Sequence, residues 1–151
     1  MTLTELAGFA GREIAVTEWL EITQERINQF ADATDDHQWI HIDPRRAERE
    51  SPYGAPIAHG FLTLSLLPKF LQDTLPIVGV RMAINYGLNR VRFPSAVRAG
   101  SRIRARIVLQ SIRDVADAAE ATYSITVECQ NAEKPCCVAE LLARYYYEKE
   151  Q

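Results

Sequence analysis

The stretch from Gly60 to Leu75 constrains the fold more than any other part of the sequence. Its apolar side chains would surround a helix and leave almost no polar stripe: Phe61, Leu62, Leu64, Leu66, Leu67, Phe70 and Leu71. A helix that is apolar nearly all round is usually buried rather than lying on a surface. It is interrupted by Pro68 and Lys69 and is shorter than the ~20 apolar residues that a membrane span needs. We therefore expect a helix in the core of a globular protein.

The segments on either side of this helix predict an α+β protein. Before it we expect a strand over 12–22, a helix that begins after Thr23 and ends near Thr34, a polar loop over 35–44 and a short helix over 45–50. After it we expect strands over 82–93, 102–107, 121–129 and 138–147. An antiparallel sheet that wraps a long buried central helix accommodates this order economically, and this is the layout of a hot-dog fold. With no linker in the sequence, we predict a single domain over residues 1–151.

Charge and cysteine usage exclude several classes of protein. The net charge of −3 argues against a nucleic-acid binder, which is usually basic. The N-terminus lacks the pattern of a signal peptide, and the three cysteines form no C-x-x-C pair, so we expect a cytoplasmic protein with reduced thiols. Eight arginines and no acidic residue lie between Arg81 and Arg113, which suggests either an anionic partner or a solvated strand face.

Asp36 and His41 are the first candidates for chemistry. They lie in a polar loop that contains three carboxylates and two histidines. Their spacing would not place them on one face of a regular helix, but a loop can bring both side chains to one water molecule. A carboxylate and an imidazole that share a water can transfer protons near neutral pH. The alternative interpretation is that both residues only cap helices and fill a polar loop.

The start of the apolar helix is the second candidate. A helix N-terminus presents free backbone N–H groups, and Gly60 has no side chain to keep a ligand from its amide. A thioester carbonyl that develops negative charge could bind there, although Gly60 could instead serve tight packing alone. A zinc site formed by His37, His41 and His59 is also conceivable, but the spacing is unlike known zinc motifs and no thiolate takes part, so we predict no metal.

Together these motifs resemble a known family. Asp36-x-x-x-x-His41-x-Asp43, followed by Tyr53-Gly54-x-Pro56-Ile57-Ala58-His59-Gly60, resembles the signature of MaoC-like dehydratases and R-specific enoyl-CoA hydratases. The run 36–41 and the run 86–94 resemble the nodulation-protein-N-like branch of that family. The sequence differs from many members at Gln38-Trp39, where they have Asn-Pro, while the spacing between the aspartate and the histidine is preserved.

The resemblance implies the function and the site residues. It implies reversible addition of water to a trans-2-enoyl thioester, with Asp36 and His41 as catalytic residues and the Gly60 amide at the substrate carbonyl. The substrate-binding residues that it implies are His59, Ile57, Tyr53, Asn89 and Arg92. Which of Asp36 and His41 handles which proton is left open.

The same resemblance implies the partners. The ligand would be acyl-CoA or an acyl carrier protein substrate, with coenzyme A as part of the substrate and no separate cofactor. Some arginines could bind coenzyme A phosphates, because guanidinium pairs well with phosphate: Arg90, Arg92, Arg98, Arg102, Arg104 and Arg106. A homodimer with two sheets joined edge to edge is expected, and no nucleic acid or membrane is expected as a partner.

Two other functions fit parts of the sequence. A hot-dog acyl-CoA thioesterase would share the fold, but those families usually carry their carboxylate on the central helix, where this chain has only Asp73 near the far end. A non-catalytic acyl-thioester binding module would have no need for both Asp36 and His41.

Overall fold

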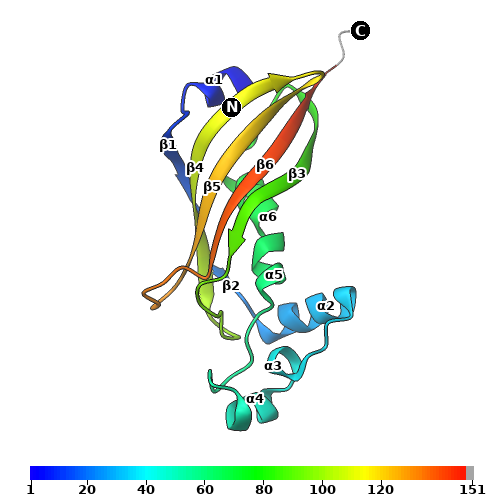
Figure 1. The fold of residues 1–151 in the computed structure, drawn as a ribbon, viewed down its shortest axis with the longest axis vertical. Helices are drawn as coiled ribbons and strands as arrows, with labels where there is room; N and C mark the ends of the chain where they lie inside the picture. Colours follow the sequence, from blue (N-terminus) through cyan, green and yellow to red (C-terminus); the bar gives the residue numbers. More distant parts are fainter. Residues whose placement is uncertain (149–151) are drawn as a thin grey trace.

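The computed structural model describes residues 1–148 and contains one antiparallel sheet with helices against one face and at one end. The strands are β1 (Arg12–Val16), β2 (Leu20–Glu21), β3 (Val80–Arg92), β4 (Arg102–Val115), β5 (Ala118–Cys129) and β6 (Cys137–Tyr147). The helices are α1 (Leu3–Ala7), α2 (Gln24–Thr34), α3 (Trp39–Ile42), α4 (Pro44–Glu50), α5 (Gly60–Ser65) and α6 (Leu67–Thr74). Strand order is β1-β4-β5-β6-β3, and β2 pairs with β4 (Figure 1). The expected α+β hot-dog fold is confirmed.

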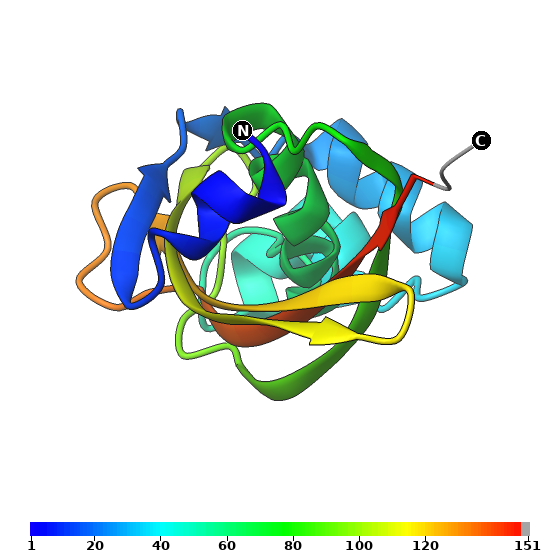
Figure 2. The same ribbon diagram turned by 90° about the horizontal axis from the view of Figure 1, so that it is seen from above.

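The expected central helix lies in the curve of the sheet, as the view from above shows (Figure 2). Leu67, Phe70 and Leu71 of α6 are buried there. They belong to one apolar cluster with side chains on the inner face of the strands: Ile103, Ala105, Ile107, Tyr123, Ile125, Val127 and Leu141. Burial of apolar side chains between a helix and a sheet is the main force that holds such layers together.

This central helix is two helices rather than the single one expected. α5 ends at Leu66, whose N–H is donated to the carbonyls of Thr63 and Leu64, and α6 starts again at Leu67. Pro68 explains the break, because proline has no N–H to donate and its ring clashes with the carbonyl four residues earlier. The two short helices remain in line within the core (Figure 1).

The strand expected over 12–22 is also divided. β1 stops at Val16 and β2 begins at Leu20, and both pair with β4. Between them Thr17 is buried, and its Oγ1 accepts a hydrogen bond from the Ala105 amide at 2.9 Å. The chain therefore leaves regular pairing where a side-chain hydroxyl replaces a backbone carbonyl as acceptor.

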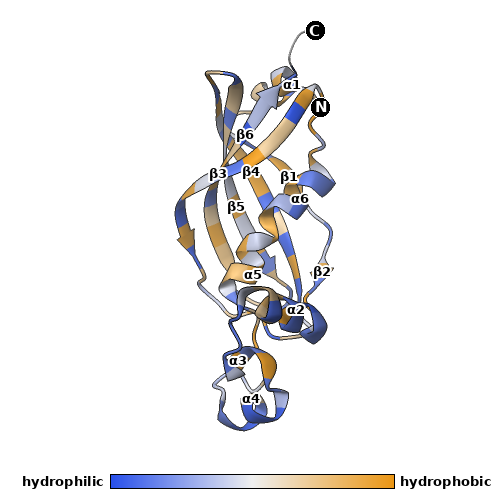
Figure 3. Cartoon of the chain, turned by 90° about the vertical axis from the view of Figure 1, so that its right-hand side faces the viewer, coloured by the Kyte–Doolittle hydropathy of each residue, from blue (hydrophilic) through white to orange (hydrophobic). Residues whose placement is uncertain are grey.

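The arginines of β4 lie on the outer face of the sheet, as their alternation predicts. Arg104 donates to Glu128 at 2.7 Å, and Arg106 forms a two-point contact with Glu13 at 2.9 and 3.0 Å. These two guanidinium groups therefore already have carboxylate partners within the sheet. The alternation of hydrophobic and hydrophilic residues along the strands is visible in Figure 3.

The three cysteines are free thiols in the core. Burial raises the pKa of Cys136 to about 12 and that of Cys137 to about 11, so both thiols stay protonated at neutral pH. In residues 1–148 no helix is long and apolar enough to span a bilayer.

The helices α2, α3 and α4 form a separate group at the end of the sheet where the central helix begins (Figure 1). Figure 3 shows this group as largely hydrophilic. The polar segment 35–44 and the start of the apolar helix therefore meet at one end of the molecule.

Candidate active site

Asp36 follows a well-defined helix end. Thr23 caps the start of α2, with its hydroxyl accepting from the Arg26 amide at 3.1 Å, and Asp35 ends the helix in the left-handed conformation with φ of 57°. This reversal directs the next residue, Asp36, back toward the protein. The Asp36 side chain is 52% exposed, so its carboxylate remains accessible to water.

His41 lies on a one-turn helix, α3, in a segment that the sequence predicted to be loop throughout. Its imidazole Nδ1 is 2.6 Å from the Ile57 carbonyl oxygen. A carbonyl only accepts hydrogen bonds, so Nδ1 carries the proton and Nε2 has a free lone pair. Burial lowers the pKa of His41, and the neighbouring His59 acts in the same direction, while the Ile57 hydrogen bond and Asp36 oppose the shift. His41 is therefore a neutral base at pH 7.

His59 connects the two candidate catalytic residues. Its Nε2 lies 3.0 Å from the Asp36 backbone oxygen and 4.0 Å from the Asp36 carboxylate. Its ring stacks on the His41 ring with centroids 3.8 Å apart and an angle of 21° between the planes. Phe30 of α2 covers another side of the His59 ring at 5.0 Å. The structure thus brings Asp36, His41 and His59 together.

Gly60 is the first residue of α5, directly after His59. Among residues 1–148, the Gly60 amide has no hydrogen-bond acceptor, as expected for the first turn of a helix with no side-chain cap. A Cβ at Gly60 would lie 2.8 to 3.0 Å from ring atoms of Phe93. The close contact with the Phe93 ring therefore favours glycine here, and the Gly60 N–H is at the same time free to donate a hydrogen bond to a ligand.

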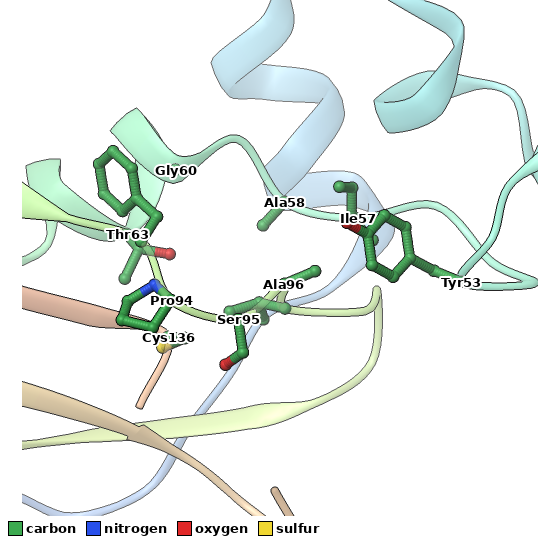
Figure 4. Close-up of a pocket in the computed structure, with 11 residues that line it drawn as sticks. Tyr53, Ile57, Ala58, Gly60, Thr63, Pro94, Ser95, Ala96 and Cys136 are labelled. Atoms are coloured by element: carbon green, nitrogen blue, oxygen red, sulfur yellow. The ribbon is translucent and has the colours of Figure 1, made fainter. Parts of the chain in front are cut away.

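A cavity of 230 Å³ lies beside this helix start (Figure 4). Three of the predicted site residues line it, Tyr53, Ile57 and Gly60, together with Phe93 and the segment from Pro94 to Val97. The segment 57–60 serves both places, because Ile57 and Gly60 line the cavity while the Ile57 carbonyl and the His59 ring contact the acid–base residues.

Asn89 and Arg92 lie on β3 and are exposed, and neither lines this cavity. The Asn89 amide donates to Glu140 at 3.2 Å, and Arg92 donates to the Val91 carbonyl at 2.7 Å. Their roles in substrate binding stay predictions.

The cluster could also be tested as a metal site. One ligand atom from each of Asp36, His41 and His59 lies within 4.8 Å of the others, whereas His37 pairs instead with Asp32 at 2.8 Å. A metal on His59 Nε2 would remove the hydrogen bond to the Asp36 carbonyl. It would also place a proton on His59 Nδ1, which is buried and has no partner in the described chain. The donor set therefore fits a hydrogen-bonded acid–base pair better than a metal ion.

The central helix offers little support for a thioesterase. Asp73 is its one carboxylate, one residue before its end, and it is exposed and paired with Lys69. A carboxylate held by lysine at the far end of α6 is poorly placed for chemistry at Gly60.

Sequence reasoning missed three features: the helix α3, the stacking of His59 on His41 and the Phe93 ring over Gly60. The sequence does contain a partial signal near α3. Asp43 followed by Pro44 indicates the start of α4, so the preceding residues 39–42 must form a short separate element. The stacking and the Phe93 contact join residues far apart in the chain, and no local pattern encodes them.

Comparison with known proteins gave concordant results. Residues 6–129 match the family model described as MaoC like domain. The 3-hydroxyacyl-thioester dehydratase Z of Mycobacterium tuberculosis is 50% identical over 145 residues, covering 95% of each chain. Nodulation protein N of Rhizobium meliloti is 45% identical over 152 residues, covering 95% of this chain and 90% of the relative.

Solved structures show the same fold. The MaoC-like dehydratase from Rhodospirillum rubrum superposes with a TM-score of 0.79 at 21% identity, over 99% of both chains. The R-hydratase PhaJ1 from Pseudomonas aeruginosa has a TM-score of 0.70 at 20% identity, over 92% of this chain and 83% of that one.

Replacement of Gly60 by alanine tests the Phe93 contact. We expect Gly60→Ala to lower the free energy of unfolding by about 1–3 kcal/mol, because the added methyl group overpacks the site against the ring. In a Phe93→Ala background the same change should cost less than about 0.5 kcal/mol, since the clash is gone. Urea unfolding of the four proteins measures this coupling, and an equal cost in both backgrounds would contradict the contact.

Proposed function

The chain belongs to the MaoC-like dehydratases, and we propose that it is an R-specific enoyl-CoA hydratase, or 3-hydroxyacyl-CoA dehydratase, with Asp36 and His41 as its acid–base pair. The relative named 3-hydroxyacyl-thioester dehydratase and the R-hydratase neighbour support the reaction class. The observation that carries the proposal is the proximity of the half-exposed Asp36 carboxylate to the neutral His41 imidazole, with ligand atoms of the two side chains within 4.8 Å of each other.

Hydration begins with one water molecule held by Asp36 and His41. An enoyl thioester is electrophilic at its β-carbon because the double bond is conjugated with the carbonyl. The water oxygen forms a bond to that carbon while His41 Nε2 takes one water proton, which the lowered pKa of His41 allows at pH 7 because the ring starts neutral. Asp36 orients the water and stabilises the imidazolium that results. The imidazolium then returns a proton to the α-carbon, and the reverse sequence is dehydration.

The intermediate enolate places negative charge on the thioester oxygen. In this proposal the free Gly60 amide donates a hydrogen bond to that oxygen at the positive end of α5. A single donor of this kind can lower a barrier by about 3 kcal/mol. Because Gly60 follows His59 in the chain, the oxyanion donor is covalently linked to the residue that contacts both catalytic side chains.

The carrier arm of the thioester would enter through the cavity at Tyr53 and Ile57. Arg98 is exposed and forms a β-bridge with Ile57, next to Val97 in the cavity wall. With Arg104 and Arg106 already paired to carboxylates, Arg98 is better placed than they are to meet coenzyme A phosphates. An acyl carrier protein would present a phosphopantetheine arm to the same opening.

A homodimer is the second part of the proposal. β3 is an edge strand of 13 residues that pairs only with β6 in the described chain. It exposes large apolar side chains: Met82, Ile84, Tyr86 and Leu88. A long edge with unpaired backbone groups and apolar side chains favours pairing with another strand, so we propose that two copies join through β3.

Loss of hydration in Asp36→Asn tests the acid–base pair, with Asp35→Asn as the matched control. We expect Asp36→Asn and His41→Ala to lower kcat for crotonyl-CoA by at least about 100-fold, the range for loss of general acid–base catalysis. The kcat of Asp35→Asn should stay within about threefold of the wild-type kcat, since asparagine also adopts the left-handed conformation found at this position. The loss of enoyl absorbance measures turnover. Full activity in Asp36→Asn would refute the assignment.

Interruption of the β3 edge tests the dimer. We expect the wild-type chain to have twice the 17.1 kDa monomer mass by light scattering, and Ile84→Lys to shift it toward monomer because a charge opposes edge pairing. Val78→Lys, at an exposed valine outside the strand, serves as the control and should leave the dimer intact. A monomeric wild type, or an Ile84→Lys protein that stays dimeric, would contradict β3 pairing.

A further inference from the structure

His59 has a chemical role that the proposed reaction does not use. Its side chain is 3% exposed, so it has little surface to offer a substrate. Nε2 faces the Asp36 backbone oxygen, and Nδ1 is buried without any partner in the described chain. A buried polar atom without a partner costs free energy, and such an atom in a native site calls for an explanation.

We propose that His59 is a positioning residue: its neutral ring holds the Asp36 backbone and the His41 imidazole at the separation that one shared water requires. This inference rests on the proposed hydratase function and adds to it a residue that touches neither water nor substrate.

The tautomer of His59 follows from its partner. The Asp36 carbonyl can only accept, so His59 Nε2 carries the proton and Nδ1 is an unprotonated acceptor. An unpaired acceptor is less costly to bury than a charged ring, and a second proton on Nδ1 would create an unpaired buried donor as well as a charge. The orphaned Nδ1 is therefore the consequence of keeping the ring uncharged beside His41.

The ring also fixes the distance between the catalytic residues. Asp36 precedes α3 and His41 lies within it, so the two residues do not belong to the same helix. His59 contacts both, one through a 3.0 Å hydrogen bond and the other by stacking at 3.8 Å. Phe30 packs against the same ring and limits its rotation. A misplacement of about 1 Å can cost about 100-fold in rate, which sets the scale of the expected effect.

The electrostatic environment is simple. The titratable groups that face His59 are Asp36 from the loop after α2 and His41 from α3, while the α2 residue packed on it is the uncharged Phe30. His59 also contributes to the lowered pKa of His41, which favours the neutral form of the His41 ring at pH 7.

Two substitutions separate the hydrogen bond from packing. His59→Phe keeps a stacked ring but loses the donor, and kcat for crotonyl-CoA should fall about 100-fold with KM changed less than about threefold. His59→Gln keeps an amide donor for the Asp36 carbonyl, so it should recover at least about a tenth of wild-type kcat. His37→Gln, the same change at an exposed histidine that pairs with Asp32, should leave kcat within about threefold of the wild type.

The tautomers of the histidines can be measured in the wild-type protein without any activity assay. ¹⁵N chemical shifts of the three histidines at pH 7.5, assigned with single substitutions, report which ring nitrogen holds each proton. We expect the Nε2–H form for His59 and the Nδ1–H form for His41. If turnover were absent but these tautomers were found, the hydratase proposal would fail while the geometry stood.

Three results would overturn the inference. An Nδ1–H tautomer of His59 would remove the bond to Asp36. A rise in KM with unchanged kcat in His59→Phe would make His59 a substrate contact instead. Equal losses of kcat in His59→Gln and His59→Phe would indicate a role in packing alone.

Discussion

The burial of α5 and α6 in the curve of the sheet determines where chemistry can occur. The side chains of these two helices fill the core, so the first residue of α5, Gly60, lies at the end of the molecule where the helix pair begins. The free amides at a helix start are unavoidable, since the first turn has no carbonyl behind it to accept them. The fold therefore places the backbone N–H of Gly60 where the polar α2–α4 group meets the core.

The proposed acid–base residues, Asp36 and His41, depend on the same junction. The Ile57 carbonyl, three residues before Gly60, selects the tautomer of His41 and leaves Nε2 as a base. Burial keeps that imidazole neutral by lowering its pKa, whereas Asp36 stays half exposed and in contact with solvent. In the proposed reaction, the exposed Asp36 carboxylate and the buried His41 imidazole would move a proton near the start of α5, while the thioester oxygen gains negative charge beside them. The segment 57–60 thus contacts both Asp36 and His41, through the Ile57 carbonyl and the His59 ring.

The parts of this structure that sequence could predict are those with a local physical signature. An apolar stretch identifies the central helix, alternation identifies β4, and Thr23 marks the start of α2. The break at Leu66 also has a local cause, because Pro68 is compatible with the first turn of α6 but not with a continuous helix. The stacking of His59 on His41 and the Phe93 ring over Gly60 had no such signature, because each joins residues whose proximity is created only by folding. The motif therefore predicts which residues form the candidate site, whereas contacts between distant parts of the chain determine how those residues are arranged.

The most direct test of the account follows the fate of water oxygen. Wild-type protein is incubated with crotonyl-CoA in H₂¹⁸O, and the products are analysed by mass spectrometry and for configuration. The account predicts R-3-hydroxybutyryl-CoA with ¹⁸O on its β-carbon and the thioester intact. Free coenzyme A with ¹⁸O in a released carboxylate, or the S product, would contradict it.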